Sequence, residues 1–444
     1  MISSRQPPSQ EAFSSPLKPL QGRLNTPGDK SISHRALILA ALASGHSRIT
    51  GLLESEDVLA TAAALSRLGA SVERVGDGEY NVAGRGGHFA KNAGQLDFGN
   101  SGTGVRLMMG AVAGSGSSAT FIGDASLSAR PMGRVTEPLS LMGAICRATD
   151  GRLPVHLSAA PLKGIDYSIP IASAQVKSAI LLAALVATGE TSVREGRATR
   201  DHTETMLKLF GAEISVERSG EGRVIRLPGP QSLSACDIIV PGDSSSAAFA
   251  TVAALIVPGS NIALTNVMTN ASRTGLYKVL QRMGADLSFS PAGQAAGEAI
   301  ADLNVRGSQL VAIDLEPDIA PSMIDEYPVL AIACAFAKGT SRLRGLAELR
   351  AKESDRLAAT HALLAANGIV ARIEADDLVI EGGGVPGGGK VRSLGDHRIA
   401  MSGLVMGLAA RDGVSVDDIN MIATSYPAFI ADMKALGAMI EVRA

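Results

Sequence analysis

One pattern that occurs six times along the chain constrains its fold more than any other feature. Each copy begins with a short loop of small polar or charged residues, enters an apolar helix, continues through a strand and a second helix, and ends at a glycine followed by a strand. The loops are 29–31, 100–102, 173–175, 243–245, 325–327 and 396–398, and the closing glycines are Gly69, Gly143, Gly211, Gly284, Gly368 and Gly437. Repeats of this length predict symmetric packing of similar units.

The first and fourth copies are the most alike. Pro27-Gly28-Asp29 recurs as Pro241-Gly242-Asp243, and a Gly-Ala pair closes both copies. The second half of the chain therefore looks like a duplicate of the first. A length of 444 residues suits two domains of three units each.

The first helix of each copy is apolar on nearly all sides. Segments 36–43, 179–187, 327–337 and 399–410 contain many small residues and few charges, and a helix without a polar face is buried. The second helices, such as 58–68 and 356–366, carry polar residues at helical spacing. We therefore expect α/β domains in which buried parallel helices are surrounded by sheets and by amphipathic outer helices.

Parallel buried helices place their N-termini at one end of each domain. Helix N-termini present N–H groups and partial positive charge, so a cluster of them facing the other half would form a cleft for anions. A helix dipole contributes only about 0.3–1 kcal/mol, so strong binding also needs formal charges. Bases stand at or near the predicted loops: Lys30, Arg35, Arg106, Arg130, Lys177, Arg200, Lys352, Arg356 and Arg398.

Composition excludes several other classes of protein. A net charge of −2 with 19% charged residues provides no global basic field, so nucleic acid and anionic membranes are poor partners. The longest apolar runs, such as 247–257, are shorter than the roughly 20 residues of a membrane helix. Three widely spaced cysteines form no metal motif and favour a reducing cytoplasm. The first 20 residues are rich in Pro, Ser and Gln, and we expect a loose tail there.

Taken singly, the charged segments have simpler interpretations. Asp29 or Ser31 could merely cap a helix, and Lys352 and Arg356 could belong to a solvated i, i+4 charge run. Asp325 could be a capping acid. Segment 384–390 has the letters of a phosphate loop, but Val391 replaces the required Ser or Thr, so we predict a flexible hairpin and disfavour an NTPase. The sixfold placement of charge at helix mouths favours an anion site over these separate interpretations.

Three segments together resemble the 5-enolpyruvylshikimate-3-phosphate (EPSP) synthase family: Asn100–Arg106, Arg130–Gly133 and Lys352–Arg356. The resemblance extends from about residue 20 to residue 442. It implies the enolpyruvyl transferase fold, with two inverse α/β-barrel-like domains of three units each. Domain 27–241 would be inserted into a discontinuous domain made of 1–26 and 242–444.

The activity that the resemblance implies is transfer of the enolpyruvyl group of phosphoenolpyruvate to the 5-hydroxyl of shikimate 3-phosphate. Phosphate leaves by addition and elimination, in the shikimate pathway of aromatic amino-acid biosynthesis. The family implies no metal and no organic cofactor, a cytoplasmic monomer, and inhibition by glyphosate. Segment 423–427 reads Ala-Thr-Ser-Tyr-Pro where some relatives have a Lys, a variant that resembles the division with glyphosate-tolerant bacterial enzymes.

The resemblance also implies a role for each matching residue. Lys30 would contact both substrates, Asp325 would act as base on the reacting hydroxyl, and Glu353 would move the proton at the methylene carbon. Residues implied to hold shikimate 3-phosphate are Ser31, Arg35, Ser173, Ala174, Gln175, Arg200 and Lys352, and those implied for phosphoenolpyruvate are Gly102, Arg130, Arg356 and Arg398, with Asn100 in the same binding loop as Gly102.

Two alternatives remain open from the sequence. The related UDP-N-acetylglucosamine enolpyruvyl transferase has the same fold, but it would need a reactive cysteine on a cleft loop. None of Cys146, Cys236 and Cys334 lies in such a loop. The second alternative is a non-catalytic anion-binding protein on this fold, although such a protein would gain nothing from carboxylates at Asp325 and Glu353.

Overall fold

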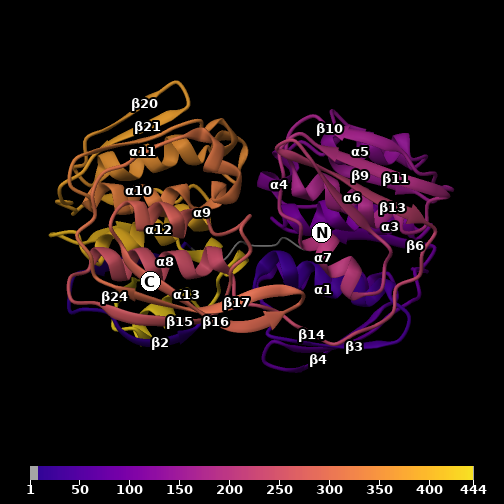
Figure 1. Ribbon diagram of the computed structural model, residues 1–444, viewed down its shortest axis with the longest axis horizontal. Helices are drawn as coiled ribbons and strands as arrows, with labels where there is room; N and C mark the ends of the chain where they lie inside the picture. The colour runs from indigo at the N-terminus through magenta and orange to yellow at the C-terminus, as the bar shows by residue number, and fades with distance from the viewer. Residues whose placement is uncertain (1–8, 444) are drawn as a thin grey trace. The chain divides into compact units, whose positions relative to one another are not determined.

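The computed structural model describes residues 9–443 and divides into two compact units (Figure 1). Unit 1 contains the chain up to Pro27, Gly242–Gly293 and the chain from Ala299 onward, and unit 2 contains Gly28–Pro241 and Gln294–Glu298. The sequence placed 294–298 in the discontinuous domain with the rest of 242–444. The structure instead assigns 294–298 to unit 2, where the buried Glu298 side chain bonds to His202.

Within residues 9–443 the strands form six four-stranded sheets of the same pattern, three in each unit. In each sheet one inner strand pairs in parallel with an edge strand and antiparallel with the other inner strand. The sheets of unit 2 are β14 (Ile238–Ile239), β3 (His46–Thr50), β5 (Glu79–Ala83), β4 (Ser71–Gly76); β6 (Asn92–Asp97), β7 (Ser118–Ile122), β9 (Arg152–Ser158), β8 (Ile145–Thr149); and β10 (Asp166–Ile169), β11 (Gly189–Glu195), β13 (Gly222–Gly229), β12 (Ser215–Ser219). The sheets of unit 1 are β22 (Lys390–Val391), β23 (Val414–Val416), β1 (Glu11–Ser15), β24 (Met439–Arg443); β16 (Asp286–Ala295), β17 (Glu298–Arg306), β15 (Asn261–Met268), β2 (Gln21–Asn25); and β18 (Asp314–Leu315), β19 (Thr340–Leu343), β21 (Asp377–Glu381), β20 (Ala371–Glu374).

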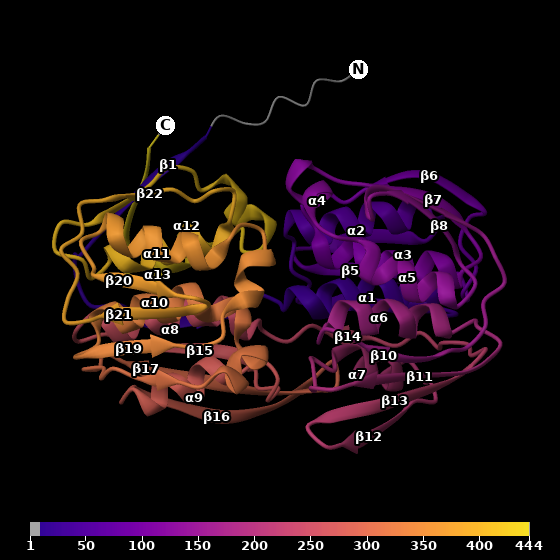
Figure 2. The same ribbon diagram turned by 90° about the horizontal axis from the view of Figure 1, so that it is seen from above.

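Three buried helices form the core of each unit, as the apolar segments predict (Figure 2). They are α1 (Lys30–Leu42), α3 (Gly102–Gly114) and α6 (Ala174–Ala184) in unit 2, and α8 (Ser244–Ile256), α10 (Tyr327–Phe336) and α12 (His397–Gly407) in unit 1. Every residue of α8 is buried. Each of the six helices begins at or directly after one of the predicted loops, so the loops lie at helix mouths.

A second helix in each repeat covers the outside of the core. These helices are α2 (Glu56–Arg67), α5 (Gly133–Leu141), α7 (His202–Leu209), α9 (Gly275–Arg282), α11 (Arg356–Ala366) and α13 (Phe429–Ala435). The predicted closing glycines follow them with φ of 89°, 111°, 85°, 90°, 79° and 98°. A left-handed residue after the last turn is a common helix stop that glycine adopts without strain, so the six predicted ends are confirmed.

Short helical segments occupy several connections. They are α4 (Ala125–Ala129) and the 3₁₀ turns η1 (Pro317–Ser322), η2 (Ile324–Glu326), η3 (Ala347–Ala351) and η4 (Asn420–Thr424). No helix among the described residues combines the length and apolarity that a membrane crossing requires.

The structure corrects two expectations from the sequence. Segment 11–15 is strand β1 rather than loose tail: Ala12 pairs with Val416 on one side and with Val442 on the other. Its partners lie some 400 residues away, so no local pattern marked it; residues 1–8 of the expected tail lie outside the described part. Segment 384–390 is not a hairpin, because it connects β21 to β22, which belong to different sheets.

Candidate functional site

The N-termini of the three buried helices in unit 2 are capped by short polar side chains. Asp29 accepts a hydrogen bond from the Ile32 N–H at 2.7 Å, and Ser101 accepts one from Gly104 at 3.2 Å. Ser173, one of the predicted site residues, caps α6 by accepting from Val176 at 3.4 Å, and Ala174 is the first residue of that helix. The interpretation of Asp29 as a cap is therefore correct, and the cap leaves the neighbouring Lys30 and Ser31 at the mouth of α1.

Arg35 joins the N-terminal turns of three helices, α1, α6 and α7. Its Nε donates to Thr203 Oγ1 of α7 at 2.7 Å, and its Nη2 donates to Ser178 Oγ of α6 at 2.8 Å. Its Nη1 donates to the Ser31 carbonyl at 2.9 Å, and the two hydroxyls lie 2.6 Å apart. Arg35 is buried, so this network fixes the guanidinium beside Ser31 instead of leaving it mobile in solvent.

Lys30 lies closer to the surface than Arg35. Its Nζ lies 2.9 Å from the Asp57 carboxylate of α2, and 19% of its side chain is exposed. An ammonium has three N–H donors, so it can bind an anion in addition to one carboxylate partner. Lys30 is therefore suited to bind a substrate anion while Asp57 orients its stem.

The Gln175 side chain accepts one hydrogen bond and donates another, and these two bonds connect the N-termini of α3 and α6. Arg106 Nη1 donates to Gln175 Oε1 at 2.8 Å, and Gln175 Nε2 donates to Thr103 Oγ1 at 2.9 Å. Thr103 and Arg106 lie in the first turns of α3. The predicted site residues of two repeats thus belong to one polar cluster.

Arg130 has the extended backbone that its position before proline predicts, with φ −80° and ψ 146°. Its Nη2 donates to Asn100 Oδ1, and Asn100 Nδ2 donates to Asp124 at 2.7 Å. A Cβ added at Gly102 would lie 2.9 Å from Arg130 Nη1 and 3.1 Å from Arg106 Nη1. Two guanidinium groups therefore approach the first residue of α3 at a place where only glycine fits without displacing them.

Lys177, one of the bases that the sequence assigned to the anion cleft, serves a structural role. It is fully buried, and its Nζ lies 3.0 Å from Glu195 and 2.7 Å from Glu204. A buried ammonium needs such partners because an isolated charge in the interior is costly. Glu195 also accepts from the Thr199 hydroxyl, which fixes the connection that carries the half-buried Arg200.

Arg356 organises the predicted residues of unit 1. The buried guanidinium binds Asp396 through Nε at 2.8 Å and through Nη2 at 3.3 Å. It also lies 2.5 Å from Glu353 and 3.2 Å from Asp325. Burial lowers the pKa of Arg356, but Asp396, Glu353 and Asp325 together raise it above its ordinary value, so the side chain stays cationic.

Asp325 does not cap a helix. It lies in η2, and its Oδ1 lies 3.2 Å from Lys352 Nζ and 3.2 Å from Arg356 Nη1. Arg398 of α12 donates to the Asp325 carbonyl at 2.9 Å and lies 3.3 Å from Glu326. The structure thus brings all five predicted residues of unit 1 into one cluster of two acids and three bases.

Sequence reasoning missed several residues that hold the predicted ones in place. Ser178 and Thr203 fix Arg35, and Asp396 fixes Arg356. From the sequence, Asp396 is identified only as an acid in the helix-mouth loop 396–398. No local signal indicates this pairing, because the sequence places Arg356 on an outer helix with polar residues, and its burial against Asp396 depends on the fold.

The fold is that of the enolpyruvyl transferases. An enolpyruvyl transferase, NikO from Streptomyces tendae, superposes on the structure with a TM-score of 0.75 over 98% of this chain and 99% of its own; at 20% identity the likeness shows the fold alone. EPSP synthase from Acinetobacter baumannii superposes with a TM-score of 0.87 and 42% identity, over 98% of this chain and 100% of that one.

Sequence comparisons give the particular family. Residues 15–433 match the family model described as EPSP synthase (3-phosphoshikimate 1-carboxyvinyltransferase). A 3-phosphoshikimate 1-carboxyvinyltransferase from Maricaulis maris is 56% identical over 96% of each chain, and one from Rhodopseudomonas palustris is 57% identical over 99% of each. The chain belongs to the EPSP synthase family.

Proposed function

We propose that this chain transfers the enolpyruvyl group of phosphoenolpyruvate to the 5-hydroxyl of shikimate 3-phosphate and releases phosphate. The observation that carries the proposal is the cluster in unit 1, where Asp325 and Glu353 both lie against the Arg356 guanidinium. Two carboxylates among cations can move protons beside a bound anion, which is the chemistry that addition and elimination require.

The two carboxylates have different tasks in this scheme. Asp325 accepts the proton of the 5-hydroxyl as its oxygen attacks C2 of phosphoenolpyruvate, while Glu353 protonates C3 and converts the methylene into a methyl group. In the elimination, C3 returns a proton and phosphate leaves C2, which restores the double bond. Arg130, Arg356 and Arg398 bind the carboxylate and phosphate of phosphoenolpyruvate, because guanidinium groups match both anions in bidentate fashion.

The residues of unit 2 bind shikimate 3-phosphate in this proposal. Lys30, Ser31 and Arg35 belong to the mouth of α1, and 173–175 belong to the mouth of α6. Backbone N–H groups at helix N-termini, together with the cations Lys30, Arg35 and Arg200, suit a phosphate monoester that also carries a carboxylate. Lys352 contributes a further cation from the loop before α11.

The cysteine chemistry argues against the UDP-N-acetylglucosamine alternative. Burial raises the pKa of Cys146 and of Cys236, and raises that of Cys334 to about 12. A reactive cysteine needs a lowered pKa, because the thiolate is the nucleophile. The three thiols are free and stay protonated at neutral pH, so none is suited to act as a thiolate nucleophile at the site.

A phosphate-release assay with both substrates tests the proposal. We expect Asp325→Asn and Glu353→Gln to lower turnover by roughly 10² to 10⁴-fold, the range for a lost general acid or base, with little change in shikimate 3-phosphate affinity for Glu353→Gln. Glu348→Gln is the matched control, because Glu348 is an exposed acid in the neighbouring η3. Near-normal turnover in both site variants would overturn the roles, and no phosphate release by the wild type would favour a non-catalytic anion-binding protein.

We further propose that the protein is a cytoplasmic monomer that glyphosate inhibits in competition with phosphoenolpyruvate. The free cysteines are in keeping with a reducing compartment. Size-exclusion chromatography with light scattering tests the monomer, and inhibition curves at several phosphoenolpyruvate concentrations test the competition. A dimer mass or non-competitive inhibition would contradict the respective statement.

A further inference from the structure

The hairpin formed by β16 and β17 has its strands in unit 1 and its tip in unit 2. The tip is Gln294–Glu298. Its turn consists of Ala296 with φ 50° and Gly297 with φ 77°, the positive angles of a two-residue type I′ turn. Alanine rarely adopts such an angle, and a strained residue of this kind persists where surrounding contacts hold it.

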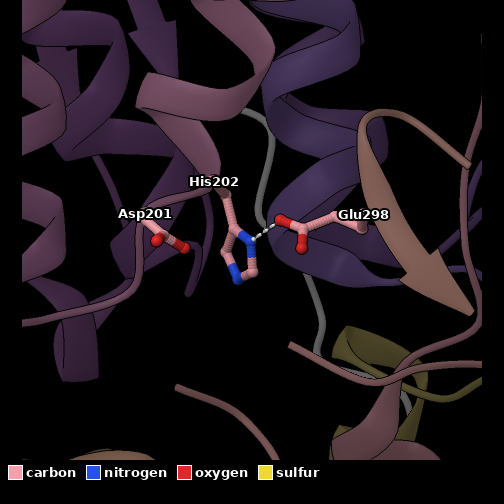
Figure 3. Close-up of side chains that lie close together, drawn as sticks. All are labelled: Asp201, His202 and Glu298. Carbon is pink, nitrogen blue, oxygen red and sulfur yellow. Dashed lines mark hydrogen bonds and ion pairs between the residues drawn. The ribbon is translucent and has the colours of Figure 1, made fainter. Parts of the chain in front are cut away.

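The contacts of the tip are made with the first turn of α7. Glu298 Oε1 lies 2.7 Å from His202 Nδ1, and both side chains are buried (Figure 3). A Cβ added at Gly297 would lie 2.7 Å from Thr205 Cγ2, so the turn packs tightly on the same helix. A buried hydrogen bond between an imidazole N–H and a carboxylate is a strong contact, and it attaches α7 to a segment remote in sequence.

A metal site is the other interpretation of these side chains. Asp201, His202 and Glu298 could each offer one ligand atom within 4.8 Å of the others. However, Arg223 Nη1 lies 2.7 Å from the Asp201 carboxylate, and His202 Nδ1 is bonded to Glu298. A guanidinium at this distance opposes a second cation, so the arrangement favours a structural contact.

The next residue of α7 leads to the predicted substrate site. Thr203 follows His202 in the first helical turn, and its Oγ1 accepts the hydrogen bond from Arg35 Nε at 2.7 Å. Arg35 also lies against the Ser31 carbonyl. A shift of the first turn of α7 would therefore change the acceptor that orients the Arg35 guanidinium.

We propose that Glu298 is a positioning residue for shikimate 3-phosphate, acting through His202 and Thr203 on Arg35. The inference rests on the proposed function, because that function assigns Arg35 to this substrate. Glu298 itself touches no reacting atom in this scheme. It holds His202, which keeps Thr203 where Arg35 needs its acceptor.

Steady-state kinetics of the full-length protein test the inference. We expect Glu298→Ala to raise the KM for shikimate 3-phosphate by about 3- to 10-fold, as for one lost hydrogen bond, with the KM for phosphoenolpyruvate and kcat nearly unchanged. Glu298→Gln keeps an oxygen that can accept from the imidazole N–H, so it should restore most of the loss. Gln294→Ala is the matched control, because Gln294 is an exposed residue of the same tip.

A double-mutant cycle tests the route of the effect. If Glu298 acts through Thr203, Glu298→Ala adds nothing further in a Thr203→Val background, whereas independent effects multiply. Thermal unfolding of each variant identifies a loss caused by misfolding, and the isosteric Glu298→Gln keeps the test open if Glu298→Ala does not fold. Equal rises in both KM values, or multiplying effects in the cycle, would overturn the inference.

Arg35→Gln separates this inference from the function on which it rests. If Arg35→Gln leaves the KM for shikimate 3-phosphate unchanged, the assignment of Arg35 to that substrate is wrong. If Arg35→Gln raises that KM and Glu298→Ala does not, the assignment stands and the role of Glu298 is wrong.

Discussion

One buried side chain, Arg356, contacts both of the carboxylates that we propose as the acid and the base. Asp396 accepts hydrogen bonds from one edge of the guanidinium, Asp325 accepts one from Nη1, and Glu353 forms an ion pair with Nη2. Removing one partner of a buried charge cluster costs about 3–5 kcal/mol, so loss of Asp396 would destabilise the cluster that holds the two carboxylates proposed as acid and base. The orientation of the two acids is set by a group that does not titrate in the working range.

The lowered pKa of His34 should make the free energy of unfolding depend on pH. His34 is buried beside Lys30 and Arg35, and burial first, followed by these two charges, lowers its pKa from 6.5 to about 3. Between these values the unfolded chain binds a proton that the folded chain does not, so stability falls as pH falls below 6.5, by about 1.4 kcal/mol per pH unit.

Urea unfolding of wild type and His34→Gln at pH 7 and pH 5 measures this effect. We expect the stability advantage of the wild type over His34→Gln to shrink by about 2 kcal/mol at the lower pH, because the variant lacks the titrating group. A constant difference between the two proteins at both pH values would show that His34 is not the residue responsible.

Substitution of Gly102 should affect the binding of glyphosate more than the binding of phosphoenolpyruvate. An added methyl would lie 2.9 Å from Arg130 Nη1, one of the guanidinium groups proposed to bind phosphoenolpyruvate. We expect Gly102→Ala to raise the KM for phosphoenolpyruvate moderately, because Arg130 must shift, and to raise the inhibition constant of glyphosate much more, because the larger ligand clashes first. Overpacking of this kind costs about 1–3 kcal/mol.

Inhibition curves at matched phosphoenolpyruvate check the Gly102 prediction. The ratio of the glyphosate constant to the KM should increase in Gly102→Ala. An unchanged ratio would mean that Gly102 does not line the part of the site that the inhibitor occupies.

The sequence could predict which residues stand at helix mouths, but not what holds them. Lys30 and Arg35 could be named because their spacing places them in the first two turns of an apolar helix, and Arg356 because it stands at the predicted start of an outer helix. Their anchors could not, since Arg35 bonds to residues 143 and 168 positions away and Arg356 to one 40 positions away. Lys177 has the same local pattern, yet its ammonium is enclosed by Glu195 and Glu204, and only the tertiary fold separates the two cases.

At the scale of elements, the approach of α3 to α6 depends on one glycine. A Cβ at Gly110 would lie 2.1 Å from the carbonyl oxygen of Ala179, so the helix backbones would have to separate. We expect Gly110→Ala to lower the free energy of unfolding by about 3 kcal/mol or more, although alanine has the higher helix propensity.

Gly133→Ala is the control for Gly110→Ala. Gly133 opens α5 and has no heavy atom within 4 Å of the added Cβ, so the substitution should be neutral or stabilising by about 0.4–1 kcal/mol. Thermal and urea unfolding of both variants compare them directly. Equal stability of the two variants would contradict close packing of α3 on α6.

Elements with a local signal could be predicted, and elements that depend on remote partners could not. The six closing glycines were visible because a left-handed helix stop requires glycine at a fixed place. Strand β1 was missed because its short Glu11–Ser15 segment has no pattern of its own and pairs with β23 and β24 near the other end of the chain. The same limit applied to the tip of the β16–β17 hairpin.

At the scale of the molecule, charge is local rather than global. The net charge is only −2, so we expect attraction of the two anionic substrates to come from the cations at the helix mouths. Raising the salt from 0.1 M to 1 M shortens the Debye length from about 10 Å to about 3 Å. We expect the KM of both substrates to rise several-fold, with a smaller change in kcat, because the buried Arg356 cluster is less screened.

Kinetics in potassium chloride, compared with sucrose at equal osmolality, measure this dependence. Sucrose should leave both KM values nearly unchanged because it carries no charge. KM values that do not depend on salt would argue against electrostatic binding of the substrates at these residues.

The discontinuity of unit 1 sets the order in which a ribosome can complete the protein. Leu20, beside β2, donates a hydrogen bond to Ser260, 240 residues later, and β2 pairs with β15. At roughly 5–20 residues per second, β2 waits on the order of 10 to 50 seconds for this partner. Meanwhile the unbroken stretch Gly28–Pro241 of unit 2 is already synthesised and can fold. The first strands to be synthesised belong to unit 1, but unit 2 is completed first and unit 1 last.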